Sequence, residues 1–301
     1  MVDAGDVLRL SVPSKSFFLG EYLALEGGPT LLAATLPRFE LAVLPGSGAV
    51  RGVEPASPAG RLISAHSGTF GSLDVEFFDP HAGAGGWGAS AAQFLMCYAA
   101  IERIRENSAH EQAAGIDIER LLSAYVDLAW DGHGYPPSGA DIIAQIEGGV
   151  VEFSRVDRVV HKRAWPFDDL EFFFVPTGNK VATHEHLRDL GRVDVTYFSA
   201  HAYSACAALM SRDSARFVGA MRGYADELER QALVHPGTAA ILQGLDALPG
   251  VLARKGCGAL GADVVVAIVR SDSAKAIAAT IAREIAAPVG RAQLSGGLTI
   301  D

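Results

Sequence analysis

The feature that most constrains the fold is a glycine-rich segment that leads directly into a long helix. Residues 81–92 read HAGAGGWGASAA and lie between a predicted strand at 73–78 and a predicted helix at 89–107. Glycines let backbone N–H groups approach an anion closely, and a helix N-terminus adds unpaired donors and a positive dipole end. We therefore predict that phosphate binds along this segment, at Gly83, Gly85, Gly86, Gly88, Ala89 and Ser90.

The hydroxyl of Ser90 would lie at the helix start, within reach of phosphate or Mg²⁺. The alternative is a flexible turn in which Ser90 is an ordinary N-terminal residue of the helix. The segment formally contains G-x-G-x-x-G, but no βαβ unit with an acidic residue after its second strand follows, which argues against a dinucleotide site. A P-loop is excluded because Gly-Lys-Ser/Thr occurs nowhere in the chain.

Three other segments combine small residues with a charged side chain. In the segment 13–22, Lys15 follows the end of a predicted strand. Asp141 lies in the first turn of a predicted helix at 140–147. The third segment, 255–263, is a tight turn that enters an apolar strand. Each has a structural explanation, since most lysines are solvated, acids stabilise helix starts and tight turns need glycine. The functional alternative places Lys15 against phosphate and Asp141 against a substrate alcohol.

The order of strands and amphipathic helices predicts two domains, each mixing both. In the first half we expect a strand or a strand with a turn at 7–12 and at 17–25, and a pair of strands within 31–44, broken by Pro37. The polar segment 156–170 marks the boundary, which gives domains of 1–160 and 161–301. In the second half we expect strands at 171–176 and 263–269. The expected helices there are 196–212, 214–233, 238–248 and 273–285.

Composition and charge narrow the classes of function. Hydrophobic residues make up 49% of the 301 residues and charged residues 20%, which is typical of a globular protein. The net charge of -10, without a basic run, makes nucleic acid a poor expected partner. No stretch reaches the roughly 18 apolar residues of a membrane span, so we expect no membrane partner. The three scattered cysteines predict reduced thiols and a cytoplasmic protein.

Five motifs in order resemble those of the GHMP kinase superfamily, which is named for galactokinase, homoserine kinase, mevalonate kinase and phosphomevalonate kinase. The family's P-G-K motif, followed by G-E-H or G-E-Y, is similar to PSKSFFLGEY, and its P-x-x-x-G-L-G-S-S-A-A loop to PHAGAGGWGASAA. Its P-S-G-x-D motif appears in PPSGAD, and its last motif, K-x-x-G-A-G-G-G, resembles KGCGALGAD. Thr177, Gly178 and Thr183 match a further T-G-x-x-x-x-T. The resemblance spans nearly the whole chain.

The resemblance implies a two-lobed α+β fold, with an N-terminal lobe like that of a ribosomal protein, a ferredoxin-like C-terminal lobe and the active site between them. It implies phosphoryl transfer from ATP, with residues 83–90 around the triphosphate and Ser90 as a ligand of Mg²⁺. Lys15 and Asp141 are the implied catalytic pair. Asp141 would orient or deprotonate the acceptor, and Lys15 would neutralise developing charge. The implied substrate contacts are Glu21, Ser138, Gly139, Thr183, Gly258 and Ala259.

Several positions depart from the family pattern. Substitutions in the loops replace glycine, leucine or serine, at Ser14, Trp87, Ala89, Leu260 and Ala262. Mevalonate kinases also place a metal-binding Glu before P-S-G-x-D, where this chain has DLAWD at 127–131. Asp127 and Asp131 are the candidate replacements for that ligand.

The resemblance leaves two mevalonate-pathway intermediates as candidate substrates. Residues 21–29 (EYLALEGGP), residues 37–39 and the last motif look most like phosphomevalonate kinase, whereas the P-S-G-x-D form and the short chain look like mevalonate kinase. We favour phosphomevalonate as the small-molecule substrate, with mevalonate as the alternative. A decarboxylase relative, or a catalytically impaired homologue that only binds a metabolite, also stays open. We expect a monomer or a homodimer.

Overall fold

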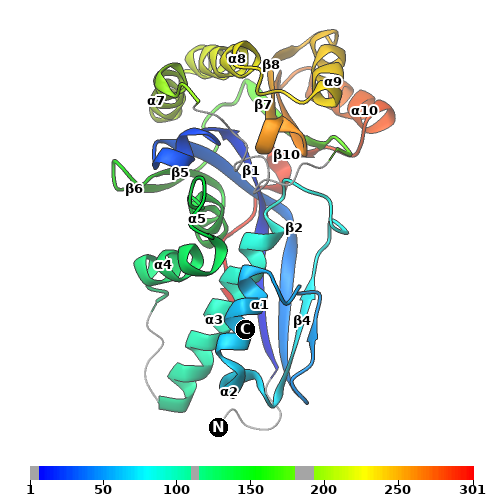
Figure 1. The fold of residues 1–301 in the computed structure, drawn as a ribbon. Helices are drawn as coiled ribbons and strands as arrows, with labels where there is room; N and C mark the ends of the chain where they lie inside the picture. Colours follow the sequence, from blue (N-terminus) through cyan, green and yellow to red (C-terminus); the bar gives the residue numbers. More distant parts are fainter. Residues whose placement is uncertain (1–6, 110–114, 180–192) are drawn as a thin grey trace.

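The computed structural model of the chain describes residues 7–109, 115–179 and 193–301 and contains two sheets (Figure 1). The larger sheet has seven strands, with the order β11-β1-β2-β4-β3 and with β5 and β6 attached to β2. The smaller has four strands in the order β10-β7-β9-β8. Each sheet and its helices form one lobe, called here the first and the second. Among these residues, no helix is both long and apolar enough to cross a membrane.

Two long antiparallel strands, β1 (Leu8–Leu19) and β2 (Thr30–Pro45), form the centre of the first lobe. Residues 40–45 of β2 pair with β4 (Leu73–Phe78), and residues 30–33 pair with β5 (Val150–Ser154). The prediction of two strands within 31–44 is therefore wrong. The pairing of β1 with β2 shifts register between Pro13 and Ser14 and skips Pro37. Because the N–H that proline lacks is not needed for pairing there, Pro37 can lie within one continuous strand.

The remaining strands of the first sheet are short or lie at its edges. They are β3 (Val50–Arg51), β6 (Val159–Arg163) and β11 (Thr299–Ile300). Strand β11 pairs with β1, so the end of the chain returns to the first lobe. Arg38 holds this return, since its guanidinium donates to the carbonyl oxygens of Gly296 and Gly297 at 2.8 Å each.

The helices of the first lobe lie on one side of its sheet (Figure 1). Helix α3 (Ala89–Ala109) packs against β1 and β2, and α5 (Ala140–Glu147) packs against β1, β2 and β5. Both begin at their predicted residues. The others are α1 (Pro58–Ala65), α2 (Ser67–Phe70) and α4 (Ile118–Ala129), which Asp117 caps by accepting from the N–H of Arg120.

The second lobe is a sheet that is buried on both faces. Alternate residues of β9 (Val264–Arg270) point to opposite sides, so Val264, Val266 and Ile268 join one apolar cluster and Val265, Ala267 and Val269 another. Helices α9 (Pro236–Asp246) and α10 (Ala274–Glu284) cover the second cluster, and α7 (Thr196–Ser211) and α8 (Ser214–Arg230) pack on the first. The other strands are β7 (Leu170–Pro176), β8 (Val251–Cys257) and β10 (Val289–Gly290).

An aromatic cluster joins the two lobes. Phe18, near the end of β1, lies 5.0 Å from Phe172 and 5.2 Å from Phe174 of β7, measured between ring centroids. Trp165 and Phe217 complete the cluster, and all of these rings are buried. Because one core runs through both lobes, β1 has a fixed place relative to the second sheet.

Candidate functional site

The predicted catalytic residues Lys15 and Asp141 form an ion pair. Lys15 Nζ lies 3.1 Å from Asp141 Oδ2, and the two side chains are 7% and 36% exposed. Lys15 belongs to the middle of β1, and Asp141 to the first turn of α5. The aliphatic part of the lysine is buried, while the carboxylate is open on one side. The structure therefore places a cation and an accessible carboxylate at one point.

The residues that precede Asp141 explain how helix α5 starts. Gly139 has φ +78°, and a Cβ there would lie 2.5 Å from Leu122 Cδ2, so glycine is favoured at this position. The hydroxyl of Ser138 accepts from the N–H of Ala140 at 3.2 Å and helps to start α5. Ser138 and Gly139, predicted as substrate contacts, thus have a clear role in shaping the helix start. Substrate contact by either residue stays a prediction.

The glycine loop, residues 83–90, lies against Lys15. The backbone N–H of Lys15 donates to the carbonyl oxygen of Trp87 at 3.0 Å. A Cβ on Gly88, whose φ is +90°, would lie 2.8 Å from Lys15 Cε and 3.1 Å from Gln145 Nε2. Gly83 and Gly86 also have positive φ values. Glycine is therefore needed where the loop meets the lysine, and α3 begins at the next residue, Ala89.

Tyr125 of α4 is a site residue that the sequence analysis missed. Its hydroxyl lies close enough to Ser90 and to Asp141 for both residues to influence its pKa. Burial raises the pKa of Tyr125 above its ordinary value, and the Asp141 carboxylate raises it further. Its ring packs on Phe94 of α3, with centroids 4.9 Å apart. Nothing local to IERLLSAYVDLA marks this tyrosine, since an aromatic residue on an amphipathic helix is usually a core residue.

The second lobe meets the glycine loop through a further loop, residues 258–263, called here the C-terminal loop. A Cβ on Gly85 would lie 2.3 Å from Asp263 Oδ1, and one on Gly86 would lie 2.8 Å from Asp263 Cβ. Gly258 has φ +79° and lies beside the same carboxylate. Ala259 begins the short 3-10 turn Ala259–Gly261, and Thr183 lies outside the described residues.

Glu21 directs its carboxylate towards the second lobe. Its Oε1 lies 2.8 Å from Nζ of Lys255, with the two side chains 6% and 0% exposed. The predicted substrate contact is therefore already occupied by a lysine from β8. Contact of Glu21 with substrate stays a prediction.

Two departures from the family pattern are neighbours in space. Ser14 Oγ donates to the carbonyl oxygen of Pro37 at 2.6 Å and lies 2.6 Å from His81 Nε2. The His81 ring in turn stacks on Trp87, with centroids 4.7 Å apart and planes 4° from parallel. Burial lowers the pKa of His81. The larger residues at 14 and 87 are thus accommodated by one histidine at the start of the glycine loop.

The residues near the glycine loop offer oxygen ligands for Mg²⁺. The hydroxyl of Ser90 and the carboxylate of Asp141 both interact with Tyr125. Mg²⁺ commonly takes one or two protein oxygens together with phosphate and water, so this small donor set fits the ion. Among the described residues, no group of three or more His, Cys, Asp or Glu side chains could hold a metal.

The two candidate replacement carboxylates lie elsewhere. Asp127 lines a groove of about 360 Å³ between α1, α3 and α4, together with Arg105 and Arg120. It follows Tyr125 by two residues on α4, which turns it to the opposite face of the helix. Asp131 is exposed and lies beside His133. Neither position associates these residues with Ser90.

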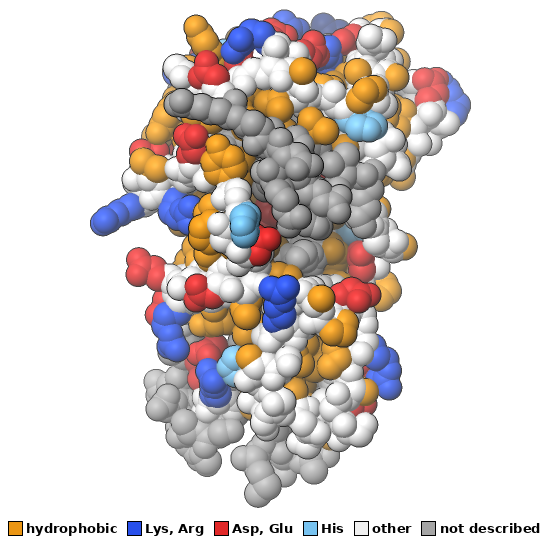
Figure 2. Space-filling view, in the orientation of Figure 1, with side chains coloured by type: hydrophobic (Ala, Val, Ile, Leu, Met, Phe, Trp, Pro, Cys, Tyr) orange, Lys and Arg blue, Asp and Glu red, His pale blue; other side chains and the backbone are white. Residues whose placement is uncertain are grey.

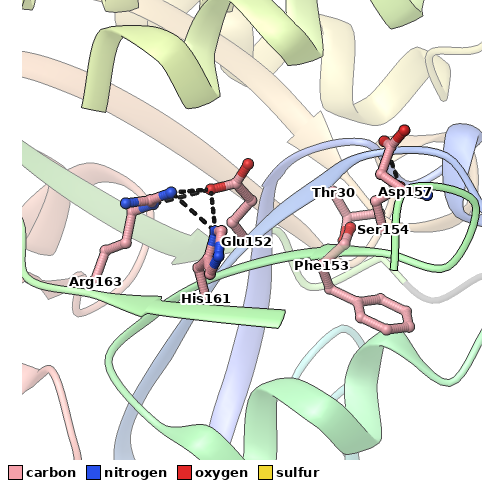
Figure 3. A network of polar contacts seen from close by, with 7 residues as sticks. All are labelled: Thr30, Glu152, Phe153, Ser154, Asp157, His161 and Arg163. Atoms are coloured by element: carbon pink, nitrogen blue, oxygen red, sulfur yellow. Dashed lines mark hydrogen bonds and ion pairs between the residues drawn. The ribbon is translucent and has the colours of Figure 1, made fainter. Parts of the chain in front are cut away.

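A separate polar network lies on the β5–β6 hairpin (Figure 3). Arg163 Nη2 donates to Glu152 Oε2 at 2.6 Å, and His161 Nδ1 lies 3.5 Å from the same oxygen. Asp157 accepts from Ser154 at 2.7 Å and from Tyr203 of α7 at 2.8 Å. The Tyr203 contact joins the hairpin to the second lobe, and none of the residues named in this network is a predicted site residue. On the face shown in Figure 2, acidic and basic side chains of the described residues are interspersed.

Comparison with known proteins identifies the fold. No protein-family model and no curated protein sequence matches the chain. Solved structures that resemble it include L. major mevalonate kinase in complex with R-mevalonate, with TM-score 0.69, 18% identity and coverage of 95% of this chain and 96% of that one. Lactococcus lactis galactokinase complexed with galactose gives TM-score 0.77 and 12% identity, over 99% of this chain and 96% of that one.

A third similar structure is Streptococcus pneumoniae phosphomevalonate kinase in complex with phosphomevalonate and AMPPNP. Its TM-score is 0.68 at 13% identity, covering 89% of this chain and 94% of that one. These similarities confirm the predicted two-lobed α+β fold, which is the fold of GHMP kinases. At such identities they concern the fold alone.

Proposed function

We propose that this protein is an ATP-dependent kinase that phosphorylates a small intermediate of the mevalonate pathway. The observation that carries the proposal is the Lys15–Asp141 pair, 3.1 Å apart, with the glycine loop packed on the lysine. A folded chain has no structural need to bring a half-open carboxylate, a buried lysine and a glycine-lined helix start to one place. Phosphoryl transfer depends on positioning the reactants and neutralising developing charge, which these three elements can supply together.

The glycine loop would bind the triphosphate. Its positive-φ glycines turn the backbone without side chains, and the N-terminus of the 21-residue helix α3 follows directly. The positive end of the helix dipole favours the phosphate charge. Ser90 would contribute its hydroxyl to a bound Mg²⁺, which would neutralise charge on the phosphate oxygens. Residues 83–90 would thus set the position of the reacting phosphorus.

Asp141 and Lys15 would act on the acceptor. In transfer to an alcohol, the acceptor proton passes to the Asp141 carboxylate while the acceptor oxygen bonds to the γ-phosphorus. The bond from that phosphorus to the bridging oxygen breaks, and ADP leaves. Lys15 stabilises the negative charge that develops on the acceptor oxygen. Its buried aliphatic stem, held under Gly88, keeps the ammonium group in one position.

Two acceptors are proposed, each on a separate observation. The motifs around Glu21 and in the C-terminal loop resemble phosphomevalonate kinase and favour phosphomevalonate. The ion pair favours an alcohol such as that of mevalonate, because a carboxylate base has a proton to remove from a hydroxyl and none from an ionised phosphate. Other alcohols are worth testing, since the structures that share the fold include galactokinase and a homoserine kinase.

The test is a coupled assay of ADP release with ATP, Mg²⁺ and, in turn, mevalonate, phosphomevalonate, diphosphomevalonate, homoserine and galactose. We expect turnover with phosphomevalonate or mevalonate, and tight ATP binding by calorimetry. ATP binding without turnover on any acceptor would instead identify a metabolite-binding homologue. If the protein binds no ATP, the kinase proposal is wrong.

A further inference from the structure

A second lysine–carboxylate pair, Lys255 with Glu21, lies sealed between the lobes. Its charged atoms are 2.8 Å apart, and its side chains are 0% and 6% exposed. Glu21 Oε2 accepts no hydrogen bond from the described residues. The Lys255 ammonium group also lies 5.6 Å from the centroid of the buried Tyr224 ring. Removing two charges from water is costly, and apolar residues of similar size often stabilise a core as well or better. Stability alone is therefore a weak reason for this pair.

The pair belongs to a set of contacts between the end of β1 and the strand β8. The thiol of Cys257 donates to the carbonyl oxygen of Phe17 at 3.1 Å. The N–H of Leu260 donates to the hydroxyl of Tyr22 at 3.2 Å. Both contacts, like the ion pair, join residues 17–22 of the first lobe to residues 255–260 of the second. The ion pair is the charged member of this set and lies at the base of the C-terminal loop.

The C-terminal loop is in contact with the glycine loop. After Lys255, the chain folds back so that a Cβ on Gly256 would lie 2.6 Å from Gly261 Cα. It ends at Asp263, against which Gly85 and Gly86 pack without room for a side chain. Lys15 lies on β1 and Glu21 follows the end of that strand. One continuous segment therefore holds the proposed catalytic lysine and, through Glu21, the loop that supports the phosphate site.

We propose that the Lys255–Glu21 pair is a positioning device. It fixes the C-terminal loop against the glycine loop and thereby sets ATP affinity and the alignment of the γ-phosphate with Lys15. This inference rests on the proposed kinase function for its effect on turnover, but its structural part, the placement of the two loops, is independent of any substrate. Neither residue touches the reacting atoms.

The test compares variants that separate stability from positioning. Glu21→Gln and Lys255→Met should each lower Tm by about 5–15 °C, because each leaves one buried partner uncompensated. The double variant Glu21→Leu with Lys255→Met should recover Tm to within about 5 °C of the unmodified protein. It should nevertheless bind ATP at least about tenfold more weakly and turn over at least about tenfold more slowly, because the C-terminal loop no longer holds the glycine loop in place.

Hydrogen exchange gives a readout that does not depend on activity. In the double variant, and to a lesser degree in Glu21→Gln, we expect faster exchange in both residues 256–263 and 83–88. The control is Arg254→Met, which changes the neighbour of Lys255 on β8. It removes the ion pairs of Arg254 Nη2 with Asp246 at 2.7 Å and of Arg254 Nη1 with Glu229 at 2.9 Å. Both partners are about half exposed, so this control should leave exchange in the two loops unchanged.

Unchanged exchange in both loops of the stable variants would overturn the proposal and leave the pair a structural contact. Recovery of ATP affinity and turnover together with Tm in the double variant would overturn it as well. If the unmodified protein proves to bind no ATP, the kinase proposal fails, and the exchange comparison alone decides whether the pair positions the loops.

Discussion

The two lysine–carboxylate pairs of this protein, Lys15–Asp141 and Lys255–Glu21, have the same chemistry and nearly equal charge separations of 3.1 and 2.8 Å. They differ in access to solvent. Asp141 is 36% exposed, whereas Glu21 is 6% exposed and its lysine is completely buried. Both lysines lie close enough to Cys257 to influence its thiol, so the pairs are neighbours.

The comparison shows how burial separates reaction from positioning. In an open pair, the carboxylate can bind a substrate in addition to its lysine or in place of it, because solvent and ligand reach the carboxylate. A sealed pair can act only through the backbone segments that it joins. We therefore expect changes at the first pair to reduce turnover more than stability, and changes at the second to reduce stability first. The following predictions test this division, from the largest expected effect to the smallest.

Asp141→Asn should reduce turnover by about 10²-fold or more, because the amide keeps the size of the side chain and loses the base. The free energy of unfolding should fall by only about 1–2 kcal/mol, since the amide oxygen can still accept from Lys15. Steady-state kinetics and chemical denaturation measure the two. Asp127→Asn, on the other face of α4, is the matched control and should leave turnover unchanged.

Gly88→Ala should reduce turnover by about 30-fold, because its Cβ meets Lys15 Cε at 2.8 Å and displaces the ammonium group. Gly83→Ala is the control. Its φ of +82° is also positive, but no described atom lies within 4 Å of the added Cβ. Because Gly83 belongs to the same loop, its variant should lose some ATP affinity, but it should lose much less turnover than Gly88→Ala because Lys15 stays in place. Backbone strain should lower its free energy of unfolding by about 1 kcal/mol. Equal kinetic losses in the two variants would refute contact with Lys15 as the cause.

Ser90→Ala should reduce turnover by about tenfold, as expected for the loss of a hydroxyl that contacts a charged ligand. As a helix-start residue alone, it would cost about 1 kcal/mol of stability and leave turnover intact. Measuring kcat together with Tm decides between these roles. A shift in Tm with unchanged kcat would favour the structural role.

Tyr125→Phe should have the smallest effect, about a fivefold loss of turnover. It removes the hydroxyl that lies near Ser90 and keeps the ring packed on Phe94. If Tyr125 acts only by holding Ser90, the double variant with Ser90→Ala should be no slower than Ser90→Ala alone. Additive losses would show that the tyrosine has a separate role.

Several elements could be predicted from the sequence because their signals are local. Helix α5 has the predicted bounds, 140–147, since a positive-φ glycine precedes it and paired glycines follow. Helices α3, α7 and α10 lie within two residues of their predicted ends. The pairing of Lys15 with Asp141 was expected only from the family resemblance.

The missed elements depend on contacts between distant segments. Strand β8, VLARKGC, has too few apolar residues to be recognised, and it is stabilised by pairing with β9. Residues 31–44 contain a proline and were predicted as two strands, but β2 continues past it because different parts of it pair with β4 and β5. Tyr125 carries no sequence signal because its role depends on the approach of α3 to α4.

The sequence by itself determined where glycines permit close backbone approach, where helices start and which charged residues follow them. These are properties of single residues and their immediate neighbours. Only the tertiary structure decided that Asp141 stays open beside Lys15 while Glu21 is sealed against Lys255. Exposure and pairing depend on how sheets and helices from opposite ends of the chain pack around each charge, and that packing is set by the shared apolar core rather than by any local pattern.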